Sequence, residues 1–228
     1  MKRSRLLPVA LVLAGPVALA VALVIPRASA AGTTVALWHM DEATGASAMA
    51  DSTGGHTGDL TKVTTGVSGF QGSAYRFNGS SSKVVVPSSG SFGIGSADFS
   101  FTVHVKFSKV PSAAVGDYDL LRGTPGGAYK LEIVARKHRT VGVASCFFNG
   151  SAGKAVLTAG PNLADNAWHT LRCVKTSNAI QLVVDGQTFS KSVTVGSITN
   201  ASPLSLGAKS GGGDWYNGLM DEVSITVG

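Results

Sequence analysis

Hydrophobic and polar residues alternate strictly between positions 99 and 107. The apolar positions are Phe99, Phe101, Val103, Val105 and Phe107, and Ser, Thr, His and Lys stand between them. A period of two over nine residues is typical of a β-strand that turns one face to a hydrophobic core. This segment therefore predicts a strand in a sheet that is covered on one side.

The same alternation recurs at Ile180, Leu182 and Val184, followed by Asp185-Gly186. Asp-Gly is typical of a two-residue hairpin turn, because both positions of a type I′ turn need positive φ. Further apolar runs predict strands at 35–40, 73–77, 83–86, 118–122, 129–135, 140–148, 168–175, 204–208 and 219–227. No long amphipathic helix pattern separates these runs. We expect an all-β fold with two packed antiparallel sheets.

Residues 1–30 have the pattern of a secretory signal peptide. Basic residues at positions 2, 3 and 5 precede the apolar run 6–25, and Ala28-Ser29-Ala30 supplies the small residues of a cleavage site. An uncleaved membrane anchor is the alternative, since the run is long enough to span a bilayer. Its prolines, at positions 8 and 16, favour cleavage. We expect a secreted, extracellular protein with one domain over 31–228 and no membrane contact after cleavage.

Removal of this segment changes the charge balance. Four of the 19 basic residues and none of the 13 acidic residues leave with it, so 15 basic residues face 13 acidic ones and the net charge falls to +2. Locally, only the segment Arg136–Arg139 is strongly basic, and no aromatic residue interrupts it. This composition argues against nucleic acid as a partner.

Two cysteines, Cys146 and Cys173, each lie within a strand-like run. In an exported chain a disulfide is the default, and two buried free thiols are the alternative. Closing a loop of about 27 residues would stabilise the fold by roughly 3–4 kcal/mol.

Several longer motifs share a characteristic order. They are WHMDE at 38–42, FNGSSSKVVVP at 77–87, WHTLRC at 168–173, LVVDG at 182–186, SPLSLGA at 202–208 and YNGLMDEVSITVG at 216–228. Their order and spacing resemble the laminin-G-like, concanavalin A-like lectin family over nearly all of the chain after residue 34. The resemblance implies a two-sheet jelly roll. It leaves function open, because this architecture hosts lectins, adhesive modules and glycan-cleaving enzymes.

The resemblance also carries expectations about pairing. In this family the strand with the Trp-His motif commonly pairs with the strand before it, which would bring Cys146 and Cys173 together. The first and last strands usually lie side by side, which would bring Asp41-Glu42 near Asp221-Glu222.

Four acids in one place repel one another unless they turn apart or hold a cation, and oxygen ligands suit calcium. Many relatives bind a structural calcium ion, which makes one a hypothesis for this chain. The candidate ligands are Asp41, Asp51, Asn78 and Asp221. The alternative is that Asp221 accepts hydrogen bonds from backbone amides while the other side chains are solvated.

The sequence offers no catalytic residues. Retaining glycoside hydrolysis needs two carboxyl groups about 5–5.5 Å apart, yet none of Glu42, Glu132 and Glu222 has an acid two or four residues away. Glu132 is expected to face solvent or a nearby Lys or Arg. The histidines are scattered, at positions 39, 56, 104, 138 and 169, and there is no Gly-x-Ser-x-Gly elbow. We expect a structural role for His169 and no enzyme activity.

Sugar sites of sandwich lectins combine an aromatic ring with Asp or Asn acceptors. Trp38 and Trp168 lie in alternating strands and are expected in the core. Trp215 follows the Gly-rich loop 210–214, and alternation with a core Tyr216 would turn it outward. Asp214 and Trp215 are therefore the candidate ligand-binding residues; the alternative is a Trp folded over the sheet rim.

The sequence thus favours a secreted, non-catalytic module that binds carbohydrate or a glycan-bearing surface. A protein-interaction or adhesion module of the cell envelope is the second hypothesis, and a cryptic glycan-cleaving enzyme is the third.

Overall fold

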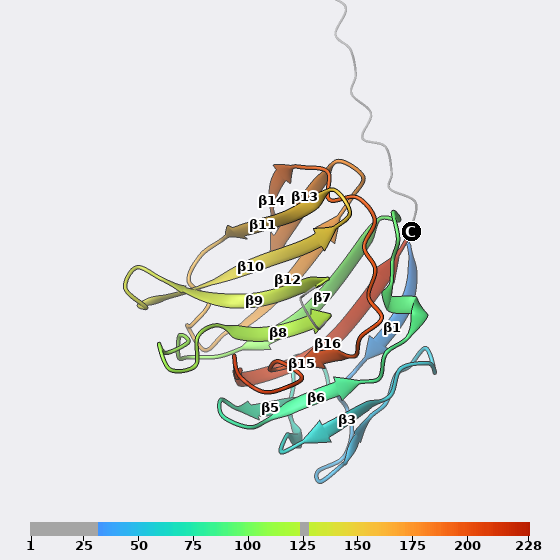
Figure 1. Ribbon diagram of the computed structural model, residues 1–228. Coiled ribbons are helices and arrows are strands. Elements are labelled where there is room, and N and C mark those ends of the chain that lie inside the picture. Colours follow the sequence, from blue (N-terminus) through green and yellow to red (C-terminus); the bar gives the residue numbers. More distant parts are fainter. Residues whose placement is uncertain (1–31, 124–127) are drawn as a thin grey trace, which may run out of the picture.

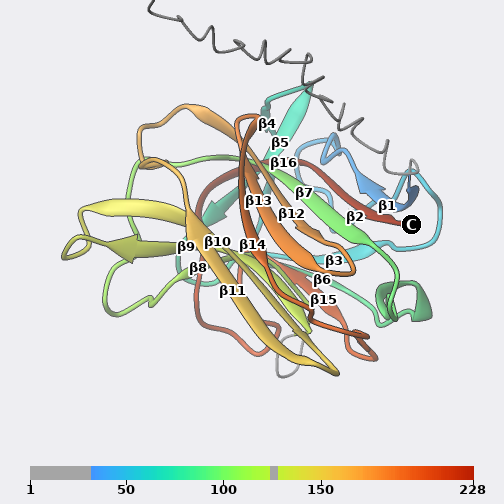
Figure 2. The same ribbon diagram turned by 90° about the horizontal axis from the view of Figure 1, so that it is seen from above.

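Two antiparallel sheets lie face to face (Figures 1 and 2). The computed structural model describes residues 32–123 and 128–228, so the signal peptide expected at 1–30 lies outside the described residues. Within the described part, no helix is long and apolar enough to cross a membrane.

The β16 sheet is the one that contains the last strand. Its strands follow the order β14 (Gln187–Ser192), β13 (Ala179–Val184), β12 (Trp168–Lys175), β7 (Phe99–Lys106), β16 (Asn217–Val227), β5 (Ser73–Asn78) and β4 (Thr64–Ser68). The first strand, β1 (Thr33–Trp38), also pairs with β16.

The β8 sheet forms the other layer. Its order is β11 (Gly153–Ala159), β10 (Val141–Gly150), β9 (Tyr129–Arg136), β8 (Tyr118–Gly123), β15 (Leu204–Leu206), β6 (Lys83–Val86), β3 (Gly58–Thr61) and β2 (Ala48–Met49). A short 3₁₀ helix, η1 (Gly90–Phe92), lies between β6 and β7.

The all-β prediction is confirmed, and each predicted strand is present with ends displaced by no more than two residues. The Asp185-Gly186 turn is also confirmed: it joins β13 to β14, and both residues have positive φ. Five strands were not predicted: β2, β3, β4, β11 and β14. They are short or polar; β14, for example, is exposed at five of its six positions, so it carries little hydrophobic pattern.

The core lies between the sheets and contains the apolar positions of β7, which are buried as predicted. Aromatic rings connect the layers: Phe101 of β7 packs 5.5 Å from Tyr129 of β9 and 5.9 Å from Phe148 of β10, centroid to centroid. Burying such a side chain contributes about 1.5–3 kcal/mol. The polar positions of β7 consequently face outward.

The disulfide between Cys146 and Cys173 is present, with the two Cα atoms 5.7 Å apart. The strand pairing that was expected to bring the two cysteines together, between β12 and the strand before it, is wrong. β12 pairs with β7 and β13, while β10 pairs with β9 and β11 in the opposite sheet. Both cysteines face inward and are fully buried, so the bond crosses the core and ties the two sheets together.

β1 and β16 lie side by side as expected, with Trp38 opposite Val223. A register shift between Asp221 and Ser224 interrupts the pairing of β16 with β7, and Glu222 adopts a φ of 46° there. This irregularity lies next to the two acid doublets.

Candidate functional site

The acid doublets Asp41-Glu42 and Asp221-Glu222 meet around the turn that joins β4 to β5. Asp221 Oδ2 accepts hydrogen bonds from the backbone amides of Phe70 (2.8 Å) and Gln71 (3.0 Å). Asp41 Oδ1 accepts one from the amide of Ser73 at 2.6 Å. Burial raises the pKa of Asp221 to about 6, although its amide donors favour the charged form. These carboxylates position the turn that carries Phe70.

The two glutamates of the doublets also have partners. Glu42 accepts hydrogen bonds from the amide of Ala50 at 2.6 Å and from the hydroxyl of Tyr75. Glu222 lies 2.9 Å from His39 Nδ1, and this hydrogen bond raises the pKa of His39.

The other calcium candidates, Asp51 and Asn78, lie in turns of their own. Asp51 Oδ1 accepts the amides of Leu37 (2.8 Å) and Thr53 (3.0 Å). Asn78 Oδ1 accepts three consecutive amides, those of residues 80 to 82. The four candidates thus do not form one coordination shell, and the described residues contain no group of three or more His, Cys, Asp or Glu side chains placed to hold a metal. Structural calcium stays a prediction.

Asp214 and Trp215 interact mainly with their own loop. Asp214 Oδ2 lies 2.8 Å from Lys209 Nζ. The Trp215 ring lies against Gly212, where an added Cβ would be 3.2 Å from Cζ2, and the side chain is partly exposed. Tyr216 is fully buried, as expected. A ligand-binding role for Asp214 and Trp215 stays a prediction.

Of the two tryptophans expected in the core, only Trp38 is there. It is fully buried, and its Nε1 donates to the backbone oxygen of His56 at 2.7 Å. The expectation for Trp168 is wrong, because β12 turns His169, Leu171 and Cys173 inward. Trp168 therefore lies on the outer face of the β16 sheet, where it is partly exposed.

Trp168 lines a hollow of about 410 Å³ on that outer face. Cross-strand pairing sets up a row of residues across four strands: Arg76 of β5 lies opposite Leu219 of β16, Leu219 opposite Lys106 of β7, and Lys106 opposite Trp168 of β12. The remaining lining residues are Val67, Ser68, Gly69, Phe107, Ser108, Asn166, Asn217 and Gly218. This hollow cannot be read from the sequence, because its residues come from five separate segments.

Phe70 stands at the rim of the hollow. Its side chain is 50% exposed, an unusual value for a large apolar residue. One ring face stacks on His104, with centroids 4.2 Å apart, and its edge approaches Trp168 at 6.0 Å. Burial lowers the pKa of His104, which favours a neutral imidazole under Phe70. Two aromatic side chains thus flank a polar depression.

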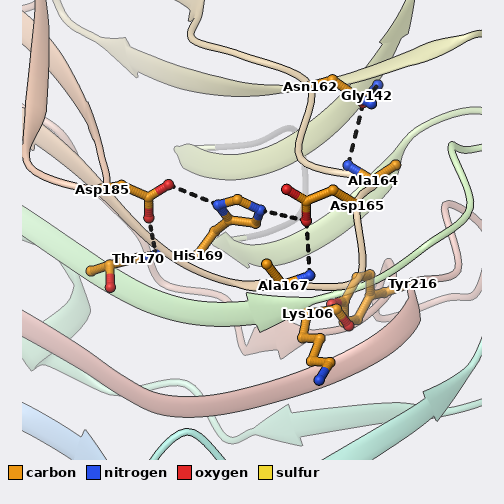
Figure 3. Close-up of polar contacts among 10 residues, drawn as sticks. All are labelled: Lys106, Gly142, Asn162, Ala164, Asp165, Ala167, His169, Thr170, Asp185 and Tyr216. Atoms are coloured by element: carbon orange, nitrogen blue, oxygen red, sulfur yellow. Dashed lines mark hydrogen bonds and ion pairs between the residues drawn. The ribbon is translucent and has the colours of Figure 1, made fainter.

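His169 lies between two carboxylates (Figure 3). Nδ1 is 2.7 Å from Asp185 Oδ2, and Nε2 is 3.0 Å from Asp165 Oδ1. Burial lowers the pKa of His169, but the two carboxylates outweigh it and the net shift is upward. Both ring nitrogens have acidic partners, so neither is left to activate a nucleophile. This arrangement fits the structural role expected for His169.

A pair of buried carboxylates lies on the β8 sheet, where Asp119 of β8 pairs directly with Glu132 of β9. The two acids come from neighbouring strands, so their pairing does not appear as a spacing of two or four residues along the sequence. Glu132 contacts Lys130, one of the alternatives expected for it, and Asp119 lies 2.9 Å from Arg122 Nη1. Burial raises the pKa of both acids. Asp119 is fully buried and Glu132 is 5% exposed.

A family model described as the concanavalin A-like lectin/glucanases superfamily matches residues 78–226. The chain belongs to this superfamily. No curated protein sequence matches the chain.

Solved structures of the same fold include the binding domain of botulinum neurotoxin DC in complex with rat synaptotagmin II, with a TM-score of 0.64 and 10% identity over 85% of this chain. This chain spans about half of that one (48%). A second structure is domain 4 of AbnA, a GH43 extracellular arabinanase from Geobacillus stearothermophilus, in complex with arabinotriose. Its TM-score is 0.60 and its sequence identity 18%, and the match covers 87% of this chain and 94% of that one. A third structure, domains LG4-5 of the mouse laminin alpha1 chain, has a TM-score of 0.51 and 21% sequence identity. The match covers 67% of this chain and 40% of that one. At these identities the likeness shows the shared jelly-roll fold alone.

Proposed function

We propose that this chain is a secreted, non-catalytic module that binds carbohydrate in the hollow on the outer face of the β16 sheet. The observation that carries the proposal is the half-exposed Phe70 beside Trp168 at the edge of a polar depression. The apolar face of a sugar ring packs on an aromatic ring, while its hydroxyls need placed polar groups around it. Asn166, Asn217 and Ser68 supply such groups.

The distribution of exposed apolar side chains favours sugar over a protein partner. Among the described residues, the large exposed hydrophobic side chains are Phe70 and Val156, on opposite sheets. They do not form the contiguous apolar patch that is typical of a protein-binding surface. The arabinanase domain of the same fold, solved with arabinotriose, lends further support.

Export fits the same proposal. The signal peptide expected at 1–30 and the disulfide between the sheets support a protein that acts outside the cell, where disulfides persist.

A glycan array tests this function, with mature wild-type protein compared with Phe70→Ala and Val156→Ala. Phe70→Ala should abolish binding with little change in melting temperature, because half of the side chain is already exposed. Val156→Ala is the matched control, since it removes a similarly exposed apolar side chain from the other sheet. Equal glycan binding by wild type and Phe70→Ala would place the sugar elsewhere.

A further inference from the structure

We infer that the hollow selects an anionic sugar residue, whose carboxylate or sulfate group lies between Arg76 and Lys106. The inference rests on the proposed function and adds the chemical class of the ligand.

The charged side chains that line the hollow are both cations. Arg76 is exposed and Lys106 is partly buried, and no Asp or Glu lines the hollow. Neither cation forms an ion pair with a described residue, whereas Arg122, Lys130 and Lys209 each do. Two cations in one depression, with no acid in its lining, give it a positive local potential that favours an anionic ligand.

Pairing fixes the spacing of the two cations. Both residues lie opposite Leu219, from either side, so their backbones are two strand spacings apart, or roughly 10 Å. Figure 3 shows the Lys106 side chain pointing away from the His169 cluster. Long side chains can close that distance around one oxyanion, and the Arg76 guanidinium can bind a carboxylate or sulfate in bidentate fashion.

The nearest acids lie outside the lining of the hollow and have partners of their own. Asp221 is fully buried and accepts three backbone amides, and Glu222 is paired with His39. Asp165 and Asp185 share the single His169 ring, so this cluster keeps a net negative charge, but neither acid lines the hollow. An anionic group in the hollow would therefore meet Arg76 and Lys106 rather than a free carboxylate.

The other walls suit the rest of a sugar. Phe70 and Trp168 offer ring surface on one side, and Asn166 and Asn217 offer amide groups to hydroxyls. The combination of ring surface, amides and two unpaired cations fits an acidic sugar better than a neutral one.

The experiment titrates mature protein with oligogalacturonate, with the same oligomer after methyl esterification, and with a sulfated galactan oligomer. We expect the acid form to bind about tenfold or more tightly than the neutral ester, because a hydrogen-bonded charge contributes more than a neutral contact. Arg76→Gln and Lys106→Gln should each remove most of that preference. Arg136→Gln, an exposed cation at the end of β9, is the matched control. Comparison of the carboxylated and sulfated oligomers identifies which anion fits.

The outcomes separate the two proposals. Equal affinity for the acid and the methyl ester would overturn the anion selectivity while leaving glycan binding intact. Loss of acid binding in Arg136→Gln but not in Arg76→Gln would also overturn it. If folded protein bound no glycan, neutral or acidic, the proposed function itself would fail.

Discussion

Trp168 shows how much one residue of phase matters in a β-strand. The strand 168–175 is predictable from its composition, but its phase decides whether Trp168 or His169 faces the core. Cys173 faces inward in the disulfide, so Leu171 and His169 face inward and Trp168 outward. The sequence alone therefore allows the outward position of Trp168 to be inferred, once Cys173 is taken to face the core. The hollow was not predictable, because it depends on which strands become neighbours.

At the same scale, His169 gives the stability a defined pH dependence. Its folded pKa is raised, so its contribution is fully present below the unfolded value of about 6.5 and is lost as pH rises through the folded pKa. Replacing His169 by Gln should therefore cost more stability at pH 6 than at pH 9. Thermal melts of both proteins at the two pH values test this. His138→Gln, in the exposed turn between β9 and β10, is the control. An equal loss at both pH values in His169→Gln would contradict the account.

At the scale of elements, the edge strands and the β4–β5 turn lie beyond sequence prediction. β4 and β14 are held by pairing with a neighbour rather than by an apolar stripe. The turn that presents Phe70 is held by Asp221 from the opposite end of the chain, a contact across 151 residues.

This contact predicts the effect of Asp221→Ala. The change leaves three backbone amides without their acceptor and should lower the free energy of unfolding by about 1–3 kcal/mol. It should also weaken glycan binding, because Phe70 loses its support. Urea unfolding and ligand titration measure the two effects, with Asp59→Ala, an exposed Asp on β3 in the other sheet, as the control. A variant with wild-type stability and binding would contradict this role.

Calcium binding is still a prediction, and it is tested with the acids around the β4–β5 turn. If Asp41 and Asp221 take part in holding an ion, chelator should lower the melting temperature and added calcium should restore it. Asp221→Ala should abolish that response. Identical melts with and without chelator, on protein shown to start metal-loaded, would remove calcium from the account.

At the scale of the whole molecule, the sequence predicts the all-β sandwich and the identity of its disulfide, but not the path of that bond. The sandwich follows from alternation, which is local, whereas the assignment of β10 and β12 to opposite sheets is a property of the whole topology.

Because the disulfide crosses the core, Cys146→Ser should lower stability by about 2–5 kcal/mol, as in other small secreted domains. Denaturant unfolding measures the change, and intact mass should show native protein two protons lighter than its reduced form. Labelling of both thiols without denaturant or reductant would contradict the bond.

The location of the sugar site is tested most directly by tryptophan fluorescence during titration with a glycan that the wild type binds. Trp38 is fully buried, so a ligand-dependent signal should come from Trp168 or Trp215. The account predicts that the signal persists in Trp215→Phe and disappears in Trp168→Phe, with both variants folded. A signal that persists in Trp168→Phe and disappears in Trp215→Phe would contradict it and place the site on the 210–214 loop.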